Sequence, residues 1–127
     1  MKELSQLIAF VATRDQARAR AFYEGVLGLR LLDADSFALA FDVGGVMLRV
    51  TNVHEITVAP YTVLGWKVTD IEATVASLEA AGVQLERYPH FTQDAHGIWD
   101  APGGSRIAWF KDPDGNTLSV AQIESAS

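Results

Sequence analysis

The chain of 127 residues contains no cysteine. This absence excludes structural disulfides, zinc sites built on thiolates, iron–sulfur clusters and a cysteine nucleophile. Long apolar runs are missing as well, because no stretch approaches the roughly 20 residues that span a bilayer. The first residues, MKELSQ, lack the basic and apolar regions of a signal peptide. We therefore expect a cytoplasmic protein that does not enter the membrane.

Positive charge is also scarce. Ten Lys and Arg residues against sixteen Asp and Glu residues give a formal net charge of −6. A surface that follows a phosphate backbone needs clustered positive charge, so we expect no binding to nucleic acid. Hydrophobic residues make up 49% of the chain and charged residues 20%, which predicts a folded core within a single domain over residues 1–127.

Two segments have the apolar spacing of an amphipathic helix. Each begins after an aspartate, Asp15 or Asp70, whose carboxylate can accept hydrogen bonds from the amides of the first turn. Each stops at a glycine, Gly28 or Gly82, which can take the left-handed conformation that ends a helix. The sequence therefore predicts two helices within these bounds.

The other apolar segments favour strands. Apolar and polar residues alternate in residues 46–51 and 63–68, as they do in a strand with one buried face. Further candidate strands are residues 4–12, 37–41, 83–88, 106–110 and 117–123. Glycine-containing turns at residues 43–45 and 113–115 predict two hairpins.

The second half of the chain repeats the first. Residues 13–15 match 68–70 at an offset of 55, and residues 42–50 match 112–120 at an offset of 70. The fold class predicted is therefore α+β, with two βαβββ repeats that form a curved mixed sheet around a concave cleft. Repeat one covers about residues 4–53 and repeat two about 61–123, with an insertion at about residues 89–104. A ferredoxin-like βαββαβ domain is the alternative, but it needs fewer strands.

Two motifs carry a resemblance to a known family. The segment 21–29 reads AFYEGVLGL, and the segment 109–116 reads WFKDPDGN. This pattern resembles the vicinal oxygen chelate (VOC) superfamily, which includes glyoxalase I, extradiol dioxygenases, fosfomycin-resistance enzymes and bleomycin-binding proteins. The resemblance extends over about residues 5–123. We interpret the DPDGN segment itself as a turn, because Pro fixes one backbone angle and Gly accepts a positive φ.

The resemblance implies a metal site in catalytic members, where four inward side chains, typically His, Gln or Glu, bind one divalent ion that polarises the substrate. The corresponding positions here are Ile8, Arg49, Val63 and Ser119. None of these side chains is a good ligand for a divalent metal. A shift of one residue is no better, since it brings Leu7, Leu48, Thr62 and Leu118 to the site. We expect no metal and no other cofactor.

The insertion in the second half is a candidate for the rim or lid of the cleft. Residues 91–104, FTQDAHGIWDAPGG, combine polar, aromatic and glycine residues, and a loop this long in a small domain usually has a function. Asp94 and His96 are candidates for a base or for two non-standard metal ligands. The alternative is an ordinary connection in which Trp99 packs against the sheet edge.

Arg49 is a charged residue on an otherwise apolar strand. By the resemblance, it enters the cleft beside Met47 and opposite Ser119, with Phe10 as part of an apolar wall. Its guanidinium could then grip a carboxylate or carbonyl of a ligand. An internal partner would have to come from the insertion, where Asp94 and Asp100 are candidates, and a salt-bridged surface arginine is the alternative.

Together these features predict a small-molecule-binding protein that sequesters a drug, an antibiotic or a metabolite. The predicted ligand-binding residues are Phe10, Met47, Arg49, Asp94, His96, Trp99 and Ser119. The alternative is a metal-dependent glyoxalase-, lyase- or dioxygenase-like enzyme with an atypical site, so whether a reaction is catalysed stays open. The partners expected are a small organic ligand and, from the resemblance, a second copy of the chain in a homodimer.

Overall fold

The computed structural model describes residues 1–124. The chain forms two compact units. The first unit contains Met1–Val58 together with Asp112–Asn116, and the second contains Ala59–Lys111 together with the residues from Thr117 onward. No helix in the described part of the chain is long and apolar enough to cross a membrane.

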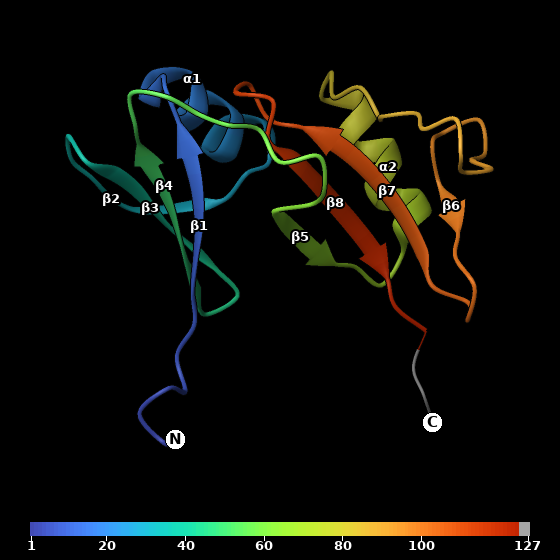
Figure 1. The fold of residues 1–127 in the computed structure, drawn as a ribbon, viewed down its shortest axis with the longest axis horizontal. Coiled ribbons are helices and arrows are strands. Elements are labelled where there is room, and N and C mark those ends of the chain that lie inside the picture. The colour runs from blue at the N-terminus through green and yellow to red at the C-terminus, as the bar shows by residue number, and fades with distance from the viewer. Residues whose placement is uncertain (125–127) are drawn as a thin grey trace. The chain divides into compact units, whose positions relative to one another are not determined.

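The first unit contains one four-stranded mixed sheet (Figure 1). Its elements in chain order are β1 (Ile8–Thr13), α1 (Gln16–Arg20), the π-helix η1 (Ala21–Val26), β2 (Arg30–Ala34), β3 (Ala38–Val43) and β4 (Val46–Asn52). The strand order is β1-β4-β3-β2, with β1 parallel to β4 and the other pairs antiparallel.

The second unit has the same arrangement. Its elements are β5 (Leu64–Lys67), α2 (Ile71–Ala80), β6 (Trp99–Asp100), β7 (Arg106–Lys111) and β8 (Thr117–Gln122). The strand order is β5-β8-β7-β6, and β5 is parallel to β8. The α+β class and the two βαβββ repeats predicted from the sequence are therefore confirmed.

The strand register agrees with both repeat offsets. Phe10 lies opposite Arg49 in the first sheet, and Gly65 lies opposite Ser119 in the second. These pairs are related by the offsets of 55 and 70 that the sequence shows. Two offsets appear because the segment between helix and hairpin is longer in the second repeat.

Each sheet buries one face beneath its own helix. In the first sheet this face carries Phe41, Leu48 and Val50, all at most 1% exposed, and the buried Tyr23 packs its ring 6.1 Å from that of Phe41. In the second sheet α2 contacts β7 and β8 and covers the equivalent buried residues. These are Ala108, Phe110, Leu118 and Val120. The alternation predicted from the sequence thus separates a helix-covered face from the opposite face in each unit. We call this opposite face, on which no helix of the same unit packs within residues 1–124, the uncovered face.

The helix starts are as predicted. Asp15 accepts a hydrogen bond from the amide of Arg18 (3.1 Å), and Asp70 accepts one from Ala73 (3.0 Å). The first helix, however, is α-helical only to Arg20 and continues as the π-helix, in which the amide of Leu27 donates to the carbonyl of Phe22 (2.9 Å). Gly28 and Gly82 have positive φ, as expected for the residues that end these helices.

Several strand predictions are wrong in extent. Residues 83–88 do not form a strand, because the outer edge of β7 is shared: β6 pairs with its beginning, and only a short bridge between Leu85 and Phe110 forms near its end. Strands β2 and β6 have no strong alternation and were not predicted. The insertion begins earlier than expected, since residues 81–98 connect α2 to β6.

The two motifs behind the family resemblance meet in a buried hydrogen-bond network. The hydroxyl of Tyr23 donates to Oδ2 of Asp112 (2.7 Å), and the side-chain amide of Asn116 donates to the same oxygen (2.9 Å) and to the carbonyl of Ala12 (2.8 Å). Burial and the neighbouring Asp112 carboxylate raise the pKa of Tyr23 far above its ordinary value. The DPDGN segment is therefore a structural turn, as predicted, and it also anchors the first helix.

Candidate functional site

The uncovered face of the second sheet holds a pocket with aromatic walls. The pocket has a volume of about 320 Å³. It is lined by Pro60, Tyr61, Thr62, Tyr88, His90, Phe91, Trp109 and Thr117. Trp109 reaches this face because it alternates along β7 with Ala108 and Phe110, which are buried on the α2 side. Its neighbours Thr62 and Thr117 contribute hydroxyl groups, so the pocket combines apolar rings with a few polar contacts.

The rings of this pocket form one continuous cluster. Phe91 lies nearly parallel to Trp109, with centroids 5.1 Å apart and an interplanar angle of 5°, and Tyr88 meets Trp109 edge-on at 5.4 Å. Behind the pocket, Trp99 stacks on Phe91 at 4.3 Å. His90 is also 4.3 Å from Phe91. Offset-stacked and edge-on contacts are the favourable geometries for aromatic pairs, so these side chains hold one another in place.

The loop between α2 and β6 brings three of these rings to the sheet. The amide of Glu86 donates to the carbonyl of Trp109 (2.7 Å), which fixes the start of the loop on β7. A turn then follows, closed by a hydrogen bond from the amide of Phe91 to the carbonyl of Tyr88 (3.1 Å). Tyr88 and Phe91 therefore pack against Trp109, and His90 packs against both of them, because the loop is attached to the strand that carries Trp109.

Charge near the pocket is nearly balanced. Burial and the Glu86 carboxylate raise the pKa of Tyr88, so its hydroxyl stays protonated and available as a donor. Glu86 in turn lies 4.0 Å from Nζ of Lys111. No Asp, Glu, Lys or Arg of residues 1–124 is thus among the lining residues of the pocket.

Two of the predicted ligand-binding residues lie on the same face as this pocket. Trp99 belongs to the aromatic cluster, and Ser119 lies opposite Trp109 in the β7–β8 pair and opposite Gly65 in the β5–β8 pair. A side chain at position 65 would have its Cβ 2.9 Å from the hydroxyl of Ser119. Gly65 therefore leaves the space that the Ser119 hydroxyl occupies.

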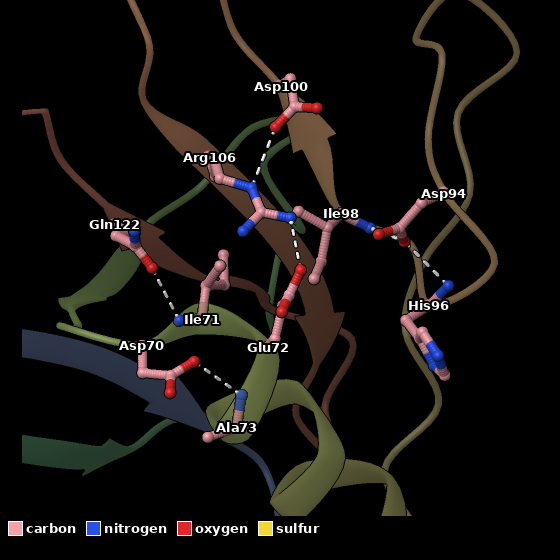
Figure 2. A network of polar contacts seen from close by, with 10 residues as sticks. All are labelled: Asp70, Ile71, Glu72, Ala73, Asp94, His96, Ile98, Asp100, Arg106 and Gln122. Carbon is pink, nitrogen blue, oxygen red and sulfur yellow. Dashed lines mark hydrogen bonds and ion pairs between the residues drawn. The ribbon is translucent and has the colours of Figure 1, made fainter.

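Asp94 and His96 lie on the other side of the second unit, beside α2 (Figure 2). Oδ1 of Asp94 accepts hydrogen bonds from the amides of His96 (2.8 Å) and Ile98 (3.0 Å). Burial alone would raise the pKa of Asp94, but these hydrogen bonds and the neighbouring charges, including that of Arg106, together outweigh it and the pKa is lowered. Nδ1 of His96 is 2.9 Å from Oε1 of Glu79 on α2. The two residues thus close a turn and attach the loop to the helix, and neither lines the aromatic pocket.

Two further pockets occur on this helix side. One, of about 320 Å³, is lined by Glu72, Ala76, Asp94, His96 and Ile98. The other, of about 370 Å³, lies near the end of α2 and includes Glu79, Arg87 and His96. Their polar groups are already engaged with one another, as in the His96–Glu79 pair and the bond from Arg87 to the carbonyl of Ala95 (2.6 Å). They are weaker candidates for a ligand site than the aromatic pocket.

Asp100 is the acceptor of a neighbouring arginine. Arg106 donates through Nε to Oδ1 of Asp100 (2.9 Å) and through Nη2 to Oε1 of Glu72 (3.1 Å), as Figure 2 shows. Asp94 and Asp100 thus both have hydrogen-bond partners within the second unit, whereas Arg49 belongs to the first unit, so a pairing of Arg49 with either carboxylate stays a prediction.

The remaining predicted residues gather on the uncovered face of the first sheet. Phe10, 59% exposed, lies directly opposite Arg49, and Met47 lies two residues before Arg49 on β4. Arg49 is half-buried, and its charge is among the influences that lower the pKa of Asp35. This placement agrees with the predicted face for Arg49, while its role in binding stays a prediction.

Comparison with known proteins gives the family. A model of the glyoxalase/bleomycin resistance protein/dioxygenase superfamily matches residues 6–120. The chain belongs to this superfamily. The resemblance to VOC proteins drawn from the two motifs is therefore confirmed. A search among curated proteins finds no match.

Solved structures of VOC proteins have the same fold. A protein described as a glyoxalase family protein from Bacillus anthracis superposes with a TM-score of 0.75 at 16% identity, over 94% of this chain and 95% of that one. A lactoylglutathione lyase from Agrobacterium tumefaciens gives 0.73 at 19% identity, over 94% and 93%. A bleomycin-binding protein in complex with bleomycin gives 0.73 at 21% identity, over 94% and 99%. At these identities the likeness establishes the fold alone.

The residues present do not fit the divalent metal that the family resemblance implies. Ile8 and Arg49 share the uncovered face of the first sheet, and Ser119 lies on that of the second, so the register supports the assignment of the positions. Yet Ile8 and Val63 offer no donor atom, Arg49 carries a positive charge, and a single serine hydroxyl is a weak ligand. Residues 1–124 also contain no group of three or more His, Asp or Glu side chains arranged to hold a metal ion elsewhere.

The sequence interpretation named none of the residues that line the aromatic pocket, although Trp99 lies beside it. Tyr61, Tyr88, His90, Phe91 and Trp109 line it but were not predicted to bind a ligand. One signal was available, since most of the rings fall within the short stretch 88–109 that includes the insertion. The insertion was predicted to be a rim or lid of the cleft, but its aromatic residues other than Trp99 were not singled out as ligand contacts.

Proposed function

We propose that this VOC protein binds a planar organic molecule in the aromatic pocket of its second repeat, without a resident divalent metal. The observation that carries the proposal is the set of half-buried rings of Tyr88, Phe91 and Trp109 around an open volume of about 320 Å³. Ligand pockets commonly have volumes from roughly 300 Å³ upward and combine apolar walls with a few polar groups.

The physical argument is that a flat ligand removes ring surface from water. Each aromatic side chain left partly exposed keeps apolar area in contact with solvent, and burial of such area is favourable by roughly 25 cal/mol per Å². Stacking adds about 0.5–1.5 kcal/mol for each aromatic pair. The hydroxyls of Thr62, Tyr88 and Thr117 would orient the ligand, because each can donate and accept a hydrogen bond.

A structural neighbour with a bound ligand and the residues at the metal positions of this chain support the proposal. One structural neighbour is a bleomycin-binding protein solved with bleomycin, so this fold is able to hold a small organic molecule. In this chain the four positions of the usual metal ligands carry Ile8, Arg49, Val63 and Ser119. A binding protein needs no donor set at these positions, whereas a metal-dependent lyase or dioxygenase does.

Titration calorimetry tests the proposal with two probes, bleomycin and the aromatic dye 8-anilinonaphthalene-1-sulfonate, whose naphthalene ring is planar. The decisive variant is Phe91→Ala, which removes the ring between Trp99 and the pocket. The matched control is Phe37→Ala, because Phe37 is 74% exposed on the first unit and lies outside the pocket.

We expect the protein to bind at least one probe, and Phe91→Ala to weaken that binding about tenfold, which corresponds to about 1.4 kcal/mol. Phe37→Ala should leave the affinity within twofold. Equal losses in the two variants, or no binding of either probe by the unmodified protein, would contradict the proposed function.

A further inference from the structure

The side chain of Gln93 bonds to both legs of the loop of residues 85–98. Its Oε1 accepts a hydrogen bond from the amide of Tyr88 (2.8 Å). Its Nε2 donates to the carbonyls of Glu86 (2.9 Å) and Gly97 (2.8 Å). Glu86 and Tyr88 belong to the first leg of the loop, which leaves the sheet after Leu85, and Gly97 belongs to the second leg, which returns to β6. The half-buried side-chain amide of Gln93 therefore connects the two sides of the loop directly, through three hydrogen bonds.

Both legs are attached to the sheet at their outer ends. Leu85 forms a bridge with Phe110, and Gln93 itself forms a backbone bridge with Trp99 at the edge strand β6. Between these attachments lies the turn 88–91, whose rings form part of the pocket wall. The turn has no strand of its own, so its position depends on the bonds that span the loop.

The chemistry of these three bonds requires a side-chain amide. One acceptor must face the Tyr88 amide while two N–H donors face carbonyl oxygens. A glutamate has the same length but presents an acceptor to those carbonyls, and an alanine removes all three bonds. Gln93 does not line the aromatic pocket itself.

We propose that Gln93 is the positioning residue of the aromatic pocket: its side-chain amide holds the loop of residues 85–98 in the form that places Tyr88 and Phe91 against Trp109, and it thereby sets the affinity for a planar ligand. The effect on affinity rests on the function proposed above, whereas the effect on the loop does not. Arg87 makes a second bond across the loop, to the carbonyl of Ala95, but Arg87 is exposed to water and holds only the outer part.

The test compares Gln93→Ala and Gln93→Glu with the control Gln84→Glu. Gln84 is exposed, lies just before the same loop and is absent from the lining of the aromatic pocket. The control therefore makes the same change of charge and leaves the three hydrogen bonds of Gln93 in place. The affinity for 8-anilinonaphthalene-1-sulfonate is measured for each variant at pH 7 and pH 5, and is divided by that of the unmodified protein at the same pH.

At pH 7 we expect both Gln93 variants to lose about tenfold or more in affinity, the scale of losing a buried hydrogen-bond partner, and Gln84→Glu to stay within twofold. At pH 5 Gln93→Glu should recover part of its loss, because a protonated carboxyl regains one donor. Gln93→Ala should not recover. A Gln93→Glu variant that binds as well as Gln84→Glu at pH 7 would overturn the proposal.

Hydrogen exchange of the Tyr88 amide provides a readout that needs no ligand. Exchange should be slow in the unmodified protein and at least tenfold faster in Gln93→Ala, while amides of β7 and β8 keep their protection. Unchanged Tyr88 exchange would overturn the positioning role. If the unmodified protein binds no dye but Tyr88 exchange accelerates as expected, the proposed function fails and the positioning of the loop by Gln93 is supported.

Discussion

The substitution Tyr23→Phe isolates the hydrogen bond that links the two family motifs. The hydroxyl of Tyr23 donates to Oδ2 of Asp112 at 2.7 Å, and the ring is fully buried. Phenylalanine keeps the ring and its contact with Phe41 but removes the donor. The change therefore tests one bond with little disturbance of packing.

The expected loss follows from what remains around Asp112. Its carboxylate keeps three donors: the Asn116 side chain on Oδ2, and the amides of Asp114 and Asn116 on Oδ1. The charge is therefore not left unpaired. A hydrogen bond to a charged group contributes about 1.5–3 kcal/mol, so we expect the free energy of unfolding to fall by about 2 kcal/mol. For a domain of this size that loss lowers the melting temperature by roughly 6–12 °C.

The pH dependence gives the same experiment a second signature. The pKa of Tyr23 is raised in the folded state, so above about pH 10 the unfolded chain releases the proton while the folded chain keeps it. The contribution of this group is present in full below that pH. It falls by about 1.4 kcal/mol per pH unit above it. The free energy of unfolding of Tyr23→Phe should therefore fall less steeply above about pH 10 than that of the unmodified protein.

Urea denaturation at pH 7, 10 and 11 measures both effects. Tyr61→Phe is the control, because Tyr61 is 66% exposed and its substitution should change stability by less than about 0.5 kcal/mol. A Tyr23→Phe variant that is as stable as Tyr61→Phe at pH 7, with the same alkaline slope as the unmodified protein, would refute the reasoning.

Three further predictions concern the binding properties. If an acidic ligand binds at the first sheet, Arg49→Ala should weaken its binding about tenfold or more and leave the fold intact, whereas Arg18→Ala, an exposed change on α1, should not. Equal affinities of the two variants for such a ligand in a calorimetric titration would end the case for Arg49 as an anion anchor. After dialysis against Ni, Zn, Mn or Fe salts, elemental analysis should find no stoichiometric metal, and one tightly held ion would restore the enzyme hypothesis. Light scattering at micromolar concentration should give the mass of a homodimer, and a monomer would rule that expectation out.

Local chemistry explains why much of the fold was predictable. Asp15 and Asp70 cap helices through hydrogen bonds to amides three residues away, and Gly28 and Gly82 end them through a conformation that glycine adopts easily. These signals depend on a few adjacent residues. The repeat offsets added a long-range constraint, and the register of Phe10 with Arg49 and of Gly65 with Ser119 agrees with it.

The parts that could not be predicted depend on contacts between distant segments. Strand β6 has only two residues and exists because Trp99 and Asp100 pair with the edge of β7. Residues 83–88 have a suitable composition for a strand, but β6 occupies the beginning of that edge, so they form only a short bridge to its end before the loop turns away. The aromatic pocket was missed for the same reason, since Tyr88 and Phe91 meet Trp109 only after the loop is folded. Asp94 and His96 were candidates for a base or for metal ligands in the sequence, yet they form hydrogen bonds within the loop and to α2.

Fluorine NMR of the protein labelled with 5-fluorotryptophan is the most direct test of the aromatic pocket. The chain has three tryptophans, and single Trp→Phe variants assign their signals. Trp109 lines the pocket, whereas Trp66 stacks with Phe110 on the helix-covered face. On addition of 8-anilinonaphthalene-1-sulfonate, or of bleomycin, we predict a saturable shift of the Trp109 signal and none of the Trp66 signal. A saturating ligand that shifts Trp66 and leaves Trp109 unchanged would contradict the account.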